Sequence, residues 1–280
     1  MIFLTRQNLK DTLKSVLSKE EIDLVRASYD IIGNIAIIEV PSELRKKGKV
    51  IAQSIVKQHK NITTVAKKIG THSGVYRTQK IKVIIGNKNT ETLYKENSTR
   101  ISLDIAKIYF SPRLATERLR IAKLAKPEEI ILVLFSGCAP YPLVIAKNSQ
   151  AKLIYGIEKN PIAHKYAVKN IKLNKLEKRV TLIKGDVKKV INNLGQKFDR
   201  IIMPLPKDSK SFIKEALTVA KNPCYLHYYT FSTIENVKHS ALNIKDTIKL
   251  LGRGCEIIDM VKCGQYSPRV YRVCIDFLLK

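Results

Sequence analysis

The sequence predicts an α/β protein in which a small α+β module precedes a doubly wound sheet of seven strands. The main observation is that short apolar runs alternate with segments of helical periodicity after residue 127, as in sheets covered by helices. A second is that the runs before residue 110 are short and separated by turn residues. A third is the length, since 280 residues with 45% hydrophobic content suffice for one large core or two smaller ones.

The first module is expected to span residues 1–110. Residues 9–26 favour one or two short helices, and a strand at 35–40 is closed by Pro41. Residues 48–59 have helical spacing, with an apolar stripe beneath a basic surface. Further strands of the module are predicted at 65–69, 81–85, 91–95 and 100–105, with a turn at 86–89.

The second domain, residues 111–280, is expected to begin with a helix to about residue 125, because Ser111 can cap it and Pro112 suits its first position. Helical spacing places Glu117 on an otherwise apolar stripe. Burial raises the pKa of a carboxyl group, which would make Glu117 a stronger base than an exposed Glu if the site also opens to a substrate. The alternative is a structural Glu that pairs with Arg118 or another basic side chain, and the residues alone leave both open.

Apolar runs mark the strands of the second domain. Helical segments join them through about residue 220, and the helix after residue 160 is well signalled, since Asn160 can cap it and Pro161 can open it. We expect the last two strands to form an antiparallel pair. The predicted strands are 130–135, 153–158, 180–185, 200–203, 225–231, 255–263 and 270–278.

A nucleotide site is predicted where the first of these strands breaks. The run 130–135 ends at Ser136-Gly137, a helix follows to Lys147, and the next strand ends at Glu158. In a parallel βαβ unit such a turn lets a ligand approach the backbone at a helix N-terminus, and an acid about 20 residues further on can accept hydrogen bonds from ribose hydroxyls. The alternative is an ordinary buried βαβ unit with a solvated Glu at a strand end.

Ligands of doubly wound sheets bind at the carboxyl ends of the strands, near the switch in strand order. Two acids at successive strand ends suit a nucleoside, Glu158 for the ribose and Asp186 for an adenine amino group. S-adenosylmethionine fits better than NAD, because the GxGxxG turn that cradles a pyrophosphate is absent from the sequence. The residues that we expect to contact this cofactor are Phe135, Gly137, Ala139, Pro140, Glu158, Lys159, Asn160, Asp186, Val187 and Pro204.

The charge balance predicts a polyanionic partner. The chain has 51 Lys and Arg against 24 Asp and Glu, a net charge of +27, and nucleic acid is the commonest partner of such a surface. A general lysine bias would spread the charge evenly, whereas residues 44–90 contain twelve Lys and Arg and no Asp or Glu. We therefore expect RNA contacts at Arg45, Lys46, Lys67, Lys68 and Arg77, joined by Arg113, Arg118 and Lys207 from the second domain.

The five cysteines contain no CxxC pair and mostly lie in apolar runs, so they are interpreted as reduced core residues, with metal ligation as the less favoured alternative. No metal is expected. No apolar run is long enough to span a bilayer, and the N-terminus alternates charged with apolar residues instead of forming a signal core. A soluble, cytoplasmic protein that binds no membrane is predicted, and we expect a monomer.

Several segments lie in an order that spans nearly the whole chain: SYDIIG at 28–33, GVYRT at 74–78, YFSPRL at 109–114, TER at 116–118, EKNP at 158–161, KNIKLN at 169–174, DRIIM at 199–203 and HYY at 227–229. Together they resemble the tRNA guanine-37 N1-methyltransferase family of archaea and eukaryotes. The resemblance implies a class I methyltransferase fold, S-adenosylmethionine as methyl donor, and the guanosine 3′ of the tRNA anticodon as target. By motif, Glu117 resembles the general base, Arg77 the residue that stabilises charge on the purine O6, and Tyr109 a residue of the cofactor and target-base pocket.

Three departures from the family pattern bear on substrate binding. The chain begins close to where the family's second domain begins, so we expect the small N-terminal domain to be absent and tRNA binding to rely on residues 44–90 and the catalytic domain. Val133 replaces an Asp before the Gly-containing turn, which removes one polar contact to the amino acid end of the cofactor. The family's Asn-Leu-Pro-Lys reads Pro204-Leu205-Pro206-Lys207, and because Pro has no side-chain donor or acceptor, the target pocket becomes less polar.

The Pro204 variant resembles the archaeal subgroup that makes wyosine-type bases. Its members methylate guanine N1 and also carbon 7 of the tricyclic intermediate 4-demethylwyosine at position 37 of tRNA-Phe, and an apolar pocket suits a bulkier tricycle. Two alternatives stay open. One is a methyltransferase for another RNA, and the other is a nonenzymatic RNA-binding protein with a degenerate cofactor fold, for which Val133 is the only support.

Overall fold

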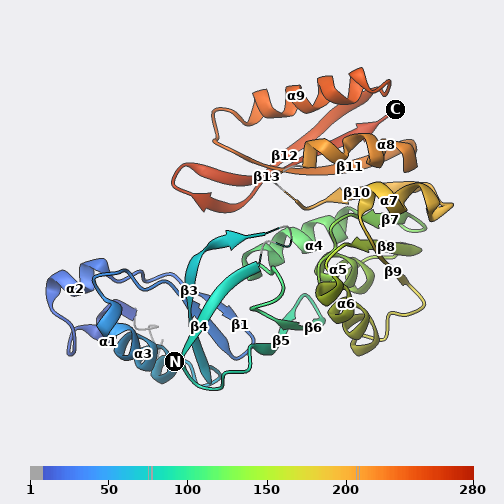
Figure 1. Cartoon of the computed structure of the whole chain (residues 1–280). Coiled ribbons are helices and arrows are strands. Elements are labelled where there is room, and N and C mark those ends of the chain that lie inside the picture. The colour runs from blue at the N-terminus through green and yellow to red at the C-terminus, as the bar shows by residue number, and fades with distance from the viewer. Residues whose placement is uncertain (1–8, 75, 77, 206, 208) are drawn as a thin grey trace, which may run out of the picture. The chain divides into compact units, whose positions relative to one another are not determined.

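The computed structural model describes residues 9–74, 76, 78–205, 207 and 209–280, with Thr71, His72 and Ser73 described by backbone alone (Figure 1). The chain divides into two compact units, and it passes between them three times. The first unit comprises Met1–Lys95 and Ser102–Pro112, and the second comprises Glu96–Ile101 and Arg113–Lys280. The segment Glu96–Ile101 therefore belongs to the second unit, whereas the sequence predicts a single boundary after residue 110.

The first unit contains a four-stranded sheet in the order β1-β2-β3-β4. Strands β2 and β3 pair in parallel because a helical crossover joins them, and the other neighbours are antiparallel. One core includes the buried side chains of Leu13, Ala36, Ile51, Ile55 and Val65. The elements are α1 (Leu9–Leu13), α2 (Lys19–Leu24), β1 (Asp30–Ile32), β2 (Ile35–Ile38), η1 (Arg45–Lys47), α3 (Gly48–Gln58), β3 (Thr64–Ser73) and β4 (Thr78–Ile85).

A separate two-stranded hairpin follows, formed by β5 (Glu91–Glu96) and β6 (Thr99–Asp104). Its turn residues Asn97 and Ser98 both have positive φ, which is the backbone that a two-residue hairpin turn of the favoured twist requires. Both strands were predicted, within one residue at each end.

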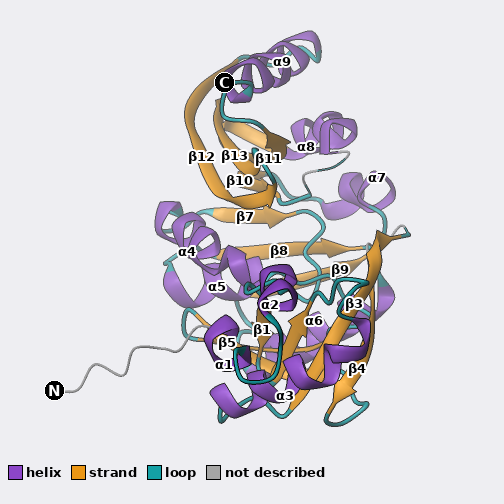
Figure 2. Ribbon diagram, turned by 90° about the vertical axis from the view of Figure 1, so that its left-hand side faces the viewer, coloured by secondary structure: helices purple, strands orange, loops and turns teal. Residues whose placement is uncertain are grey.

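The second unit contains the predicted seven-stranded sheet, in the order β12-β13-β11-β10-β7-β8-β9. Figure 2 shows the strands stacked in this order. Strands β11, β10, β7, β8 and β9 are parallel, and β13 runs antiparallel to both β11 and β12, which confirms the expected pair. The strands are β7 (Ile130–Val133), β8 (Leu153–Glu158), β9 (Val180–Lys184), β10 (Phe198–Met203), β11 (Ala220–Ser232), β12 (Cys255–Ser267) and β13 (Val270–Leu279).

The strand order reverses direction at β7, because the chain adds β8 and β9 on one side of it and β10 on the other. The carboxyl ends of parallel strands lie at one edge of a sheet, and a crevice forms where the order reverses. The turn after Val133 and the residues after Glu158, Lys184 and Met203 therefore share one edge of the second unit. This edge is where the sequence places its candidate cofactor site.

The helices of the second unit begin somewhat differently from the prediction. The segment after Ser111 starts as a 3-10 turn, so α4 begins at Ala115 and Leu114 occupies its cap position. Helix α6 begins as predicted, with the Asn160 side chain accepting from the backbone N–H groups of Ile162 and Ala163. The helices are η2 (Pro112–Leu114), α4 (Ala115–Leu124), α5 (Pro140–Asn148), α6 (Pro161–Leu173), α7 (Val187–Val190), η3 (Ile191–Leu194), η4 (Ser209–Phe212), α8 (Ile213–Val219) and α9 (Val237–Leu250).

Among the residues that the structure describes, no helix combines the length and the apolar content needed to cross a bilayer.

Candidate active site in the seven-stranded unit

The turn after β7 has a backbone that suits close approach of a ligand. Phe135, Gly137 and Ala139 have φ values of +54°, +57° and +68°. Residues other than Gly rarely adopt such values, and strained positions of this kind cluster at ligand sites. A Cβ added at Gly137 would meet no heavy atom within 4 Å, so open space lies beside the turn. The predicted contacts Phe135, Gly137, Ala139 and Pro140 therefore lie together, next to that space.

Glu158 ties this turn to the end of β8. Its Oε2 accepts a hydrogen bond from the Gly137 backbone N–H at 2.7 Å, and its Oε1 accepts from the Asn160 N–H at 2.6 Å. Burial raises the pKa of Glu158, while the backbone donors from Asn160, Gly137 and Lys159 oppose that shift. A carboxylate offers about four lone-pair positions, so at least one remains for a ribose hydroxyl.

Asp186 lies at the next strand end and also caps α7. Its carboxylate accepts from the Lys188 backbone N–H at 3.0 Å and pairs with Lys159 Nζ at 2.8 Å. The hydrogen bond from Lys159 is the main cause that lowers the pKa of Asp186. Val187 is buried as the first residue of α7, and Pro204 is partly buried directly after β10. The predicted contacts thus share one edge of the sheet.

Glu117 is buried on α4, with 4% of its surface exposed. Arg120 forms hydrogen bonds with both carboxylate oxygens of Glu117: its Nε donates to Oε2 and its Nη2 to Oε1, each at 2.8 Å. The Tyr229 hydroxyl donates to Oε1 at 2.5 Å. The sequence suggested that Glu117 pairs with Arg118 or with another basic side chain. The partner is Arg120, and Arg118 pairs with Glu96 instead.

Tyr141 links Glu117 to the cofactor turn. It lies in the first turn of α5, directly after Pro140, and its ring packs edge to face on Tyr229 with the centroids 6.1 Å apart. Burial raises the pKa of Tyr141 well above its ordinary value, and the charge of Glu117 adds to this effect. The candidate base and the candidate cofactor turn are thus neighbours within the second unit.

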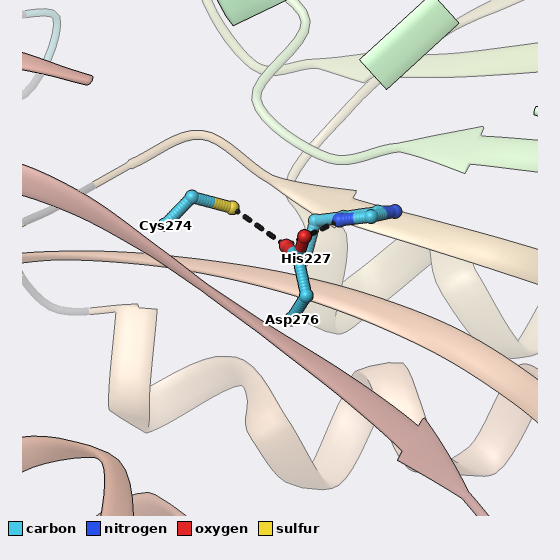
Figure 3. Close-up of side chains that lie close together, drawn as sticks. All are labelled: His227, Cys274 and Asp276. Carbon is cyan, nitrogen blue, oxygen red and sulfur yellow. Dashed lines mark hydrogen bonds and ion pairs between the residues drawn. The ribbon is translucent and has the colours of Figure 1, made fainter. Parts of the chain in front are cut away.

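The hydrogen bonds continue from Arg120 to a buried histidine. Arg120 Nη1 donates to Asp276 Oδ2 at 2.7 Å, and His227 Nδ1 lies 2.6 Å from Asp276 Oδ1 (Figure 3). Arg200 Nη1 lies 2.7 Å from His227 Nε2. A guanidinium can only donate, so Nε2 is the acceptor and Nδ1 carries the proton. His227 is therefore the neutral imidazole, and burial is the main cause that lowers its pKa.

This arrangement bears on metal ligation, the alternative that the cysteine pattern left open. The ligand atoms of His227, Cys274 and Asp276 lie within 4.8 Å of one another, close enough for a metal ion. Both ring nitrogens of His227 are engaged, however, and Figure 3 shows the Cys274 thiol directed at the same carboxylate, at 3.1 Å. Burial raises the pKa of this thiol well above its usual range. The cluster is better explained as a hydrogen-bond network than as a cation site.

Arg118, expected to bind RNA, has a different environment. Its guanidinium forms two hydrogen bonds of 2.5 Å with the Glu96 carboxylate, and only 2% of the residue is exposed. Asn97 Nδ2 in the same segment donates to the Ala115 carbonyl, and the Asn148 side chain donates to the Asn97 carbonyl. Arg118 thus anchors the hairpin turn to α4, and the RNA-contact prediction is corrected because a buried, paired guanidinium does not face a phosphate.

The other predicted RNA contacts differ in exposure. Arg45 and Lys46 are exposed on η1, and Arg113 and Lys207 are exposed in the second unit. Lys67 and Lys68 are partly buried on β3, and Lys68 Nζ lies 3.2 Å from Glu39 and 3.8 Å from Asp30, so part of its charge is already neutralised. Arg77 lies outside the described residues. Tyr109, in the first unit, is 38% exposed.

All five cysteines are free thiols, and Cys138, Cys224 and Cys274 are buried, in agreement with their interpretation as reduced core residues. Sequence reasoning missed Arg120, Arg200 and Asp276 as site residues. The signal for Arg120 was present, because residues three apart share a helix face whereas adjacent residues do not.

Two family models match the chain. The first, the TRM5/TYW2 methyltransferase domain, covers residues 92–258, and the second, the TYW2 N-terminal domain, covers residues 9–90.

Several curated relatives are archaeal tRNA-modifying enzymes. The chain is 40% identical over 251 residues to the tRNA (guanine(37)-N(1))-methyltransferase Trm5b of Pyrococcus abyssi, covering 89% of this chain and 74% of the relative. It is 34% identical over 302 residues to the tRNA (guanine(37)-N(1))/4-demethylwyosine(37)-methyltransferase Taw22 of Nanoarchaeum equitans, covering 90% and 99%. It is 31% identical over 276 residues to the tRNA(Phe) (4-demethylwyosine(37)-C(7)) aminocarboxypropyltransferase of Pyrococcus horikoshii, covering 96% and 97%.

Solved structures agree with these matches. The complex of aTrm5 with tRNALeu superposes with a TM-score of 0.84 at 30% identity, covering 99% of this chain and 79% of that one. TYW2 of P. horikoshii in complex with MeSAdo superposes with a TM-score of 0.80 at 28% identity, covering 98% and 99%.

Proposed function

This chain belongs to the TRM5/TYW2 methyltransferase family, and we propose that it transfers a methyl group from S-adenosylmethionine to N1 of guanosine 37 in tRNA and to C7 of 4-demethylwyosine at the same position. The observation that most supports this function is the Glu117 carboxylate, which is buried, held by three hydrogen bonds and adjacent to the helix that opens at the cofactor turn. A buried carboxylate in this position suits a general base.

The residues after β7, β8 and β9 fit the nucleoside half of S-adenosylmethionine. The open space beside Gly137 admits a ligand close to the backbone, and the acceptor positions left on Glu158 suit ribose hydroxyls. Asp186 has acceptor capacity for an adenine amino group. When bound, the cofactor would supply an electrophilic methyl group on a positively charged sulfur, with the S–C bond breaking as the bond to the purine forms.

Guanine N1 carries a proton at neutral pH, so its lone pair becomes nucleophilic only when a base removes that proton. Glu117 takes the proton in this proposal, and Arg77 stabilises the negative charge that grows on the purine O6. The same base serves C7 of 4-demethylwyosine, where a C–H proton leaves. Pro204, which has no side-chain donor or acceptor, leaves the target pocket apolar enough for the tricycle.

The tRNA is proposed to bind through exposed cations and stacking aromatics. Arg45 and Lys46 on η1 contact phosphates, assisted by Lys67, and Arg113 and Lys207 contribute from the second unit. The target base must leave the stack of the anticodon loop, and Tyr109, which is 38% exposed, can stack on it. We propose that the protein acts as a monomer in the cytoplasm.

A second function, transfer of the aminocarboxypropyl group of the same cofactor to C7 of 4-demethylwyosine, has one specific observation in its favour. Residues 9–90 match the TYW2 N-terminal domain, and a relative named for that transfer aligns over 97% of its own length. The two reactions break different bonds of one sulfonium. A methyltransferase for another RNA is a further alternative, since the cofactor residues say little about the target.

Mass spectrometry of nucleosides separates these functions. The full chain would be incubated with S-adenosylmethionine and tRNA-Phe transcripts that hold either guanosine or 4-demethylwyosine at position 37. We expect a methylated nucleoside from both, and a rate lower by more than about tenfold for Glu117→Gln with tRNA affinity retained. Aminocarboxypropylated product would establish the second function, and cofactor binding without product on either tRNA would point to another RNA. Failure to bind the cofactor in calorimetry would indicate a nonenzymatic RNA-binding protein.

A further inference from the structure

A buried network of hydrogen-bonded side chains begins at Glu117 in the second unit. It connects helix α4 to strands β13, β11 and β10 and to the residue before β7. Its charged members are three carboxylates and two guanidinium groups, and the one histidine is neutral because Arg200 occupies its acceptor nitrogen. Asp276 and Glu129 balance Arg120 and Arg200, so the one negative charge in excess in this buried network is that of Glu117 itself. Its members, in order, are Glu117, Arg120, Asp276, His227, Arg200 and Glu129.

We propose that Arg120, Tyr229 and Asp276 are positioning residues that act through Glu117: Arg120 and Tyr229 hold its carboxylate by hydrogen bonds, and Asp276 offsets the positive charge of Arg120. The inference rests on the proposed function, in which Glu117 receives the proton that leaves N1 or C7 while the bonding electron pair stays on the purine. When Glu117 takes this proton, the buried network becomes neutral. Removing an uncompensated charge from a buried environment is favourable.

The donors around Glu117 also select which oxygen reacts. Arg120 and Tyr229 together occupy both acceptor positions of Oε1 and one of Oε2, so the remaining position is on Oε2. The Cys263 thiol interacts with the same carboxylate, whose charge adds to burial in raising the pKa of the thiol. A thiol is a weak donor, so a purine N–H can replace it. We assign the incoming proton to Oε2.

The remaining titratable groups near Glu117 add no charge to this count. They are Tyr141 on α5, Tyr229 on β11, Cys263 on β12 and Cys274 on β13, and burial raises the pKa of each. These hydroxyls and thiols are therefore neutral near pH 7. Arg118, the nearest further cation on α4, is neutralised by Glu96.

Two substitutions are expected to act in opposite directions. Tyr229→Phe removes one hydrogen bond from the charged carboxylate, so Glu117 should take up its proton at a higher pH. Asp276→Asn removes the anion that shares Arg120 with Glu117, so proton uptake should need a lower pH. Residues with a merely structural role would shift the midpoint in neither variant, or in the same direction in both.

Carbon-13 NMR of selectively labelled Glu carboxyl groups in the full chain measures this directly, with Glu117→Gln to assign the signal. The matched control is Tyr225→Phe, which removes a hydroxyl from the same strand, one that accepts from Lys126 and does not contact Glu117. We expect the pH midpoint of Glu117 protonation to be lowest in Asp276→Asn and highest in Tyr229→Phe. The wild type and the control should have the same midpoint, between these two. Equal midpoints in all four proteins, or the reverse order, would overturn the inference. If Asp276→Asn fails to fold, the difference in midpoint between Tyr229→Phe and its control Tyr225→Phe still tests the inference.

Single-turnover methyl transfer over the same pH range then tests whether the shift reaches catalysis. The acid limb of the rate profile should move with the NMR midpoint in each variant, with cofactor and tRNA affinities unchanged. If the wild type transfers no group to either tRNA, the proposed function fails, while the NMR order still decides the positioning role. If transfer occurs and the limbs coincide, the positioning role is wrong and the function stands.

Discussion

The ion pair between Arg118 and Glu96 provides a direct test of the second unit's structure. Both side chains are almost fully buried, at 2% and 3% exposure, and two hydrogen bonds of 2.5 Å join them. Hydrogen bonds to charged groups are worth about 1.5–3 kcal/mol each. Removing one partner of a buried pair typically costs about 3–5 kcal/mol, because the other charge stays buried without compensation. We expect this loss in the free energy of unfolding for Arg118→Met.

Two further variants identify the cause of that loss. Arg113→Met makes the same replacement at an exposed position on η2 and should change stability by less than about 0.5 kcal/mol. The double variant Arg118→Met with Glu96→Leu replaces the pair by apolar side chains and should recover most of the loss.

Urea unfolding followed by circular dichroism gives these free energies, with an unchanged slope indicating the same transition. Because the chain has two compact units, the transition of the second unit must be followed separately, for example through the near-ultraviolet signal of its tyrosines. If Arg118→Met costs less than about 1 kcal/mol, or if the double variant is no more stable than the single one, the buried pair does not anchor the hairpin turn.

Four other predictions concern the turn, the histidine, the RNA surface and the pocket. Ala139→Gly relieves a left-handed alanine and should stabilise the chain by up to about 1 kcal/mol, and a lower melting temperature would contradict this. His227 has a lowered pKa, so the unfolded chain binds its proton more readily and stability should fall as the pH drops below about 6.5. His227→Gln should flatten that slope in pH-dependent melts, and exposed His239→Gln should not. Lys46→Ala should lower the slope of log affinity for tRNA against log salt by about one, and an unchanged slope would remove it from the interface. Pro204→Asn should shift the ratio of nitrogen to carbon methylation by nucleoside mass spectrometry, and an unchanged ratio would exclude a selectivity role.

Local patterns explain how much of the fold could be predicted. The seven-stranded sheet follows from apolar runs, and the start of α6 follows from Asn160 and Pro161, because caps act within a few residues. Helix α9 was missed, although Ala241, Ile244 and Ile248 share one buried face at helical spacing. The residue Glu158 was found for the same local reason, since a strand, a turn and a second strand bring it to Gly137.

The partners of Glu117 could not be predicted in this way. Arg120 and Asp276 are 156 residues apart in sequence, and they meet because α4 packs near a strand that is added at the far end of the chain. Nothing in the sequence near Asp276 marks it as a partner of Arg120. Arg118 was wrongly assigned to the RNA-binding surface for a related reason. In a strongly basic chain a basic residue is expected to be exposed, and the sequence does not show that Arg118 pairs with Glu96.

The surface and the interior of this protein place opposite demands on a carboxylate base. A surface with a net charge of +27 suits RNA but favours the charged form of every carboxylate, and a base must give up that charge when it takes a proton. Solvent ions screen exposed charges within about 10 Å, whereas buried groups are screened much less. The charges that matter for Glu117 are therefore the buried ones, and among them Asp276 and Glu129 balance Arg120 and Arg200, so Glu117 faces no net charge from the rest of the network. A chain can in this way keep a strongly basic exterior for its polyanionic substrate and still hold, a few ångströms inside, a carboxylate that is able to accept a proton.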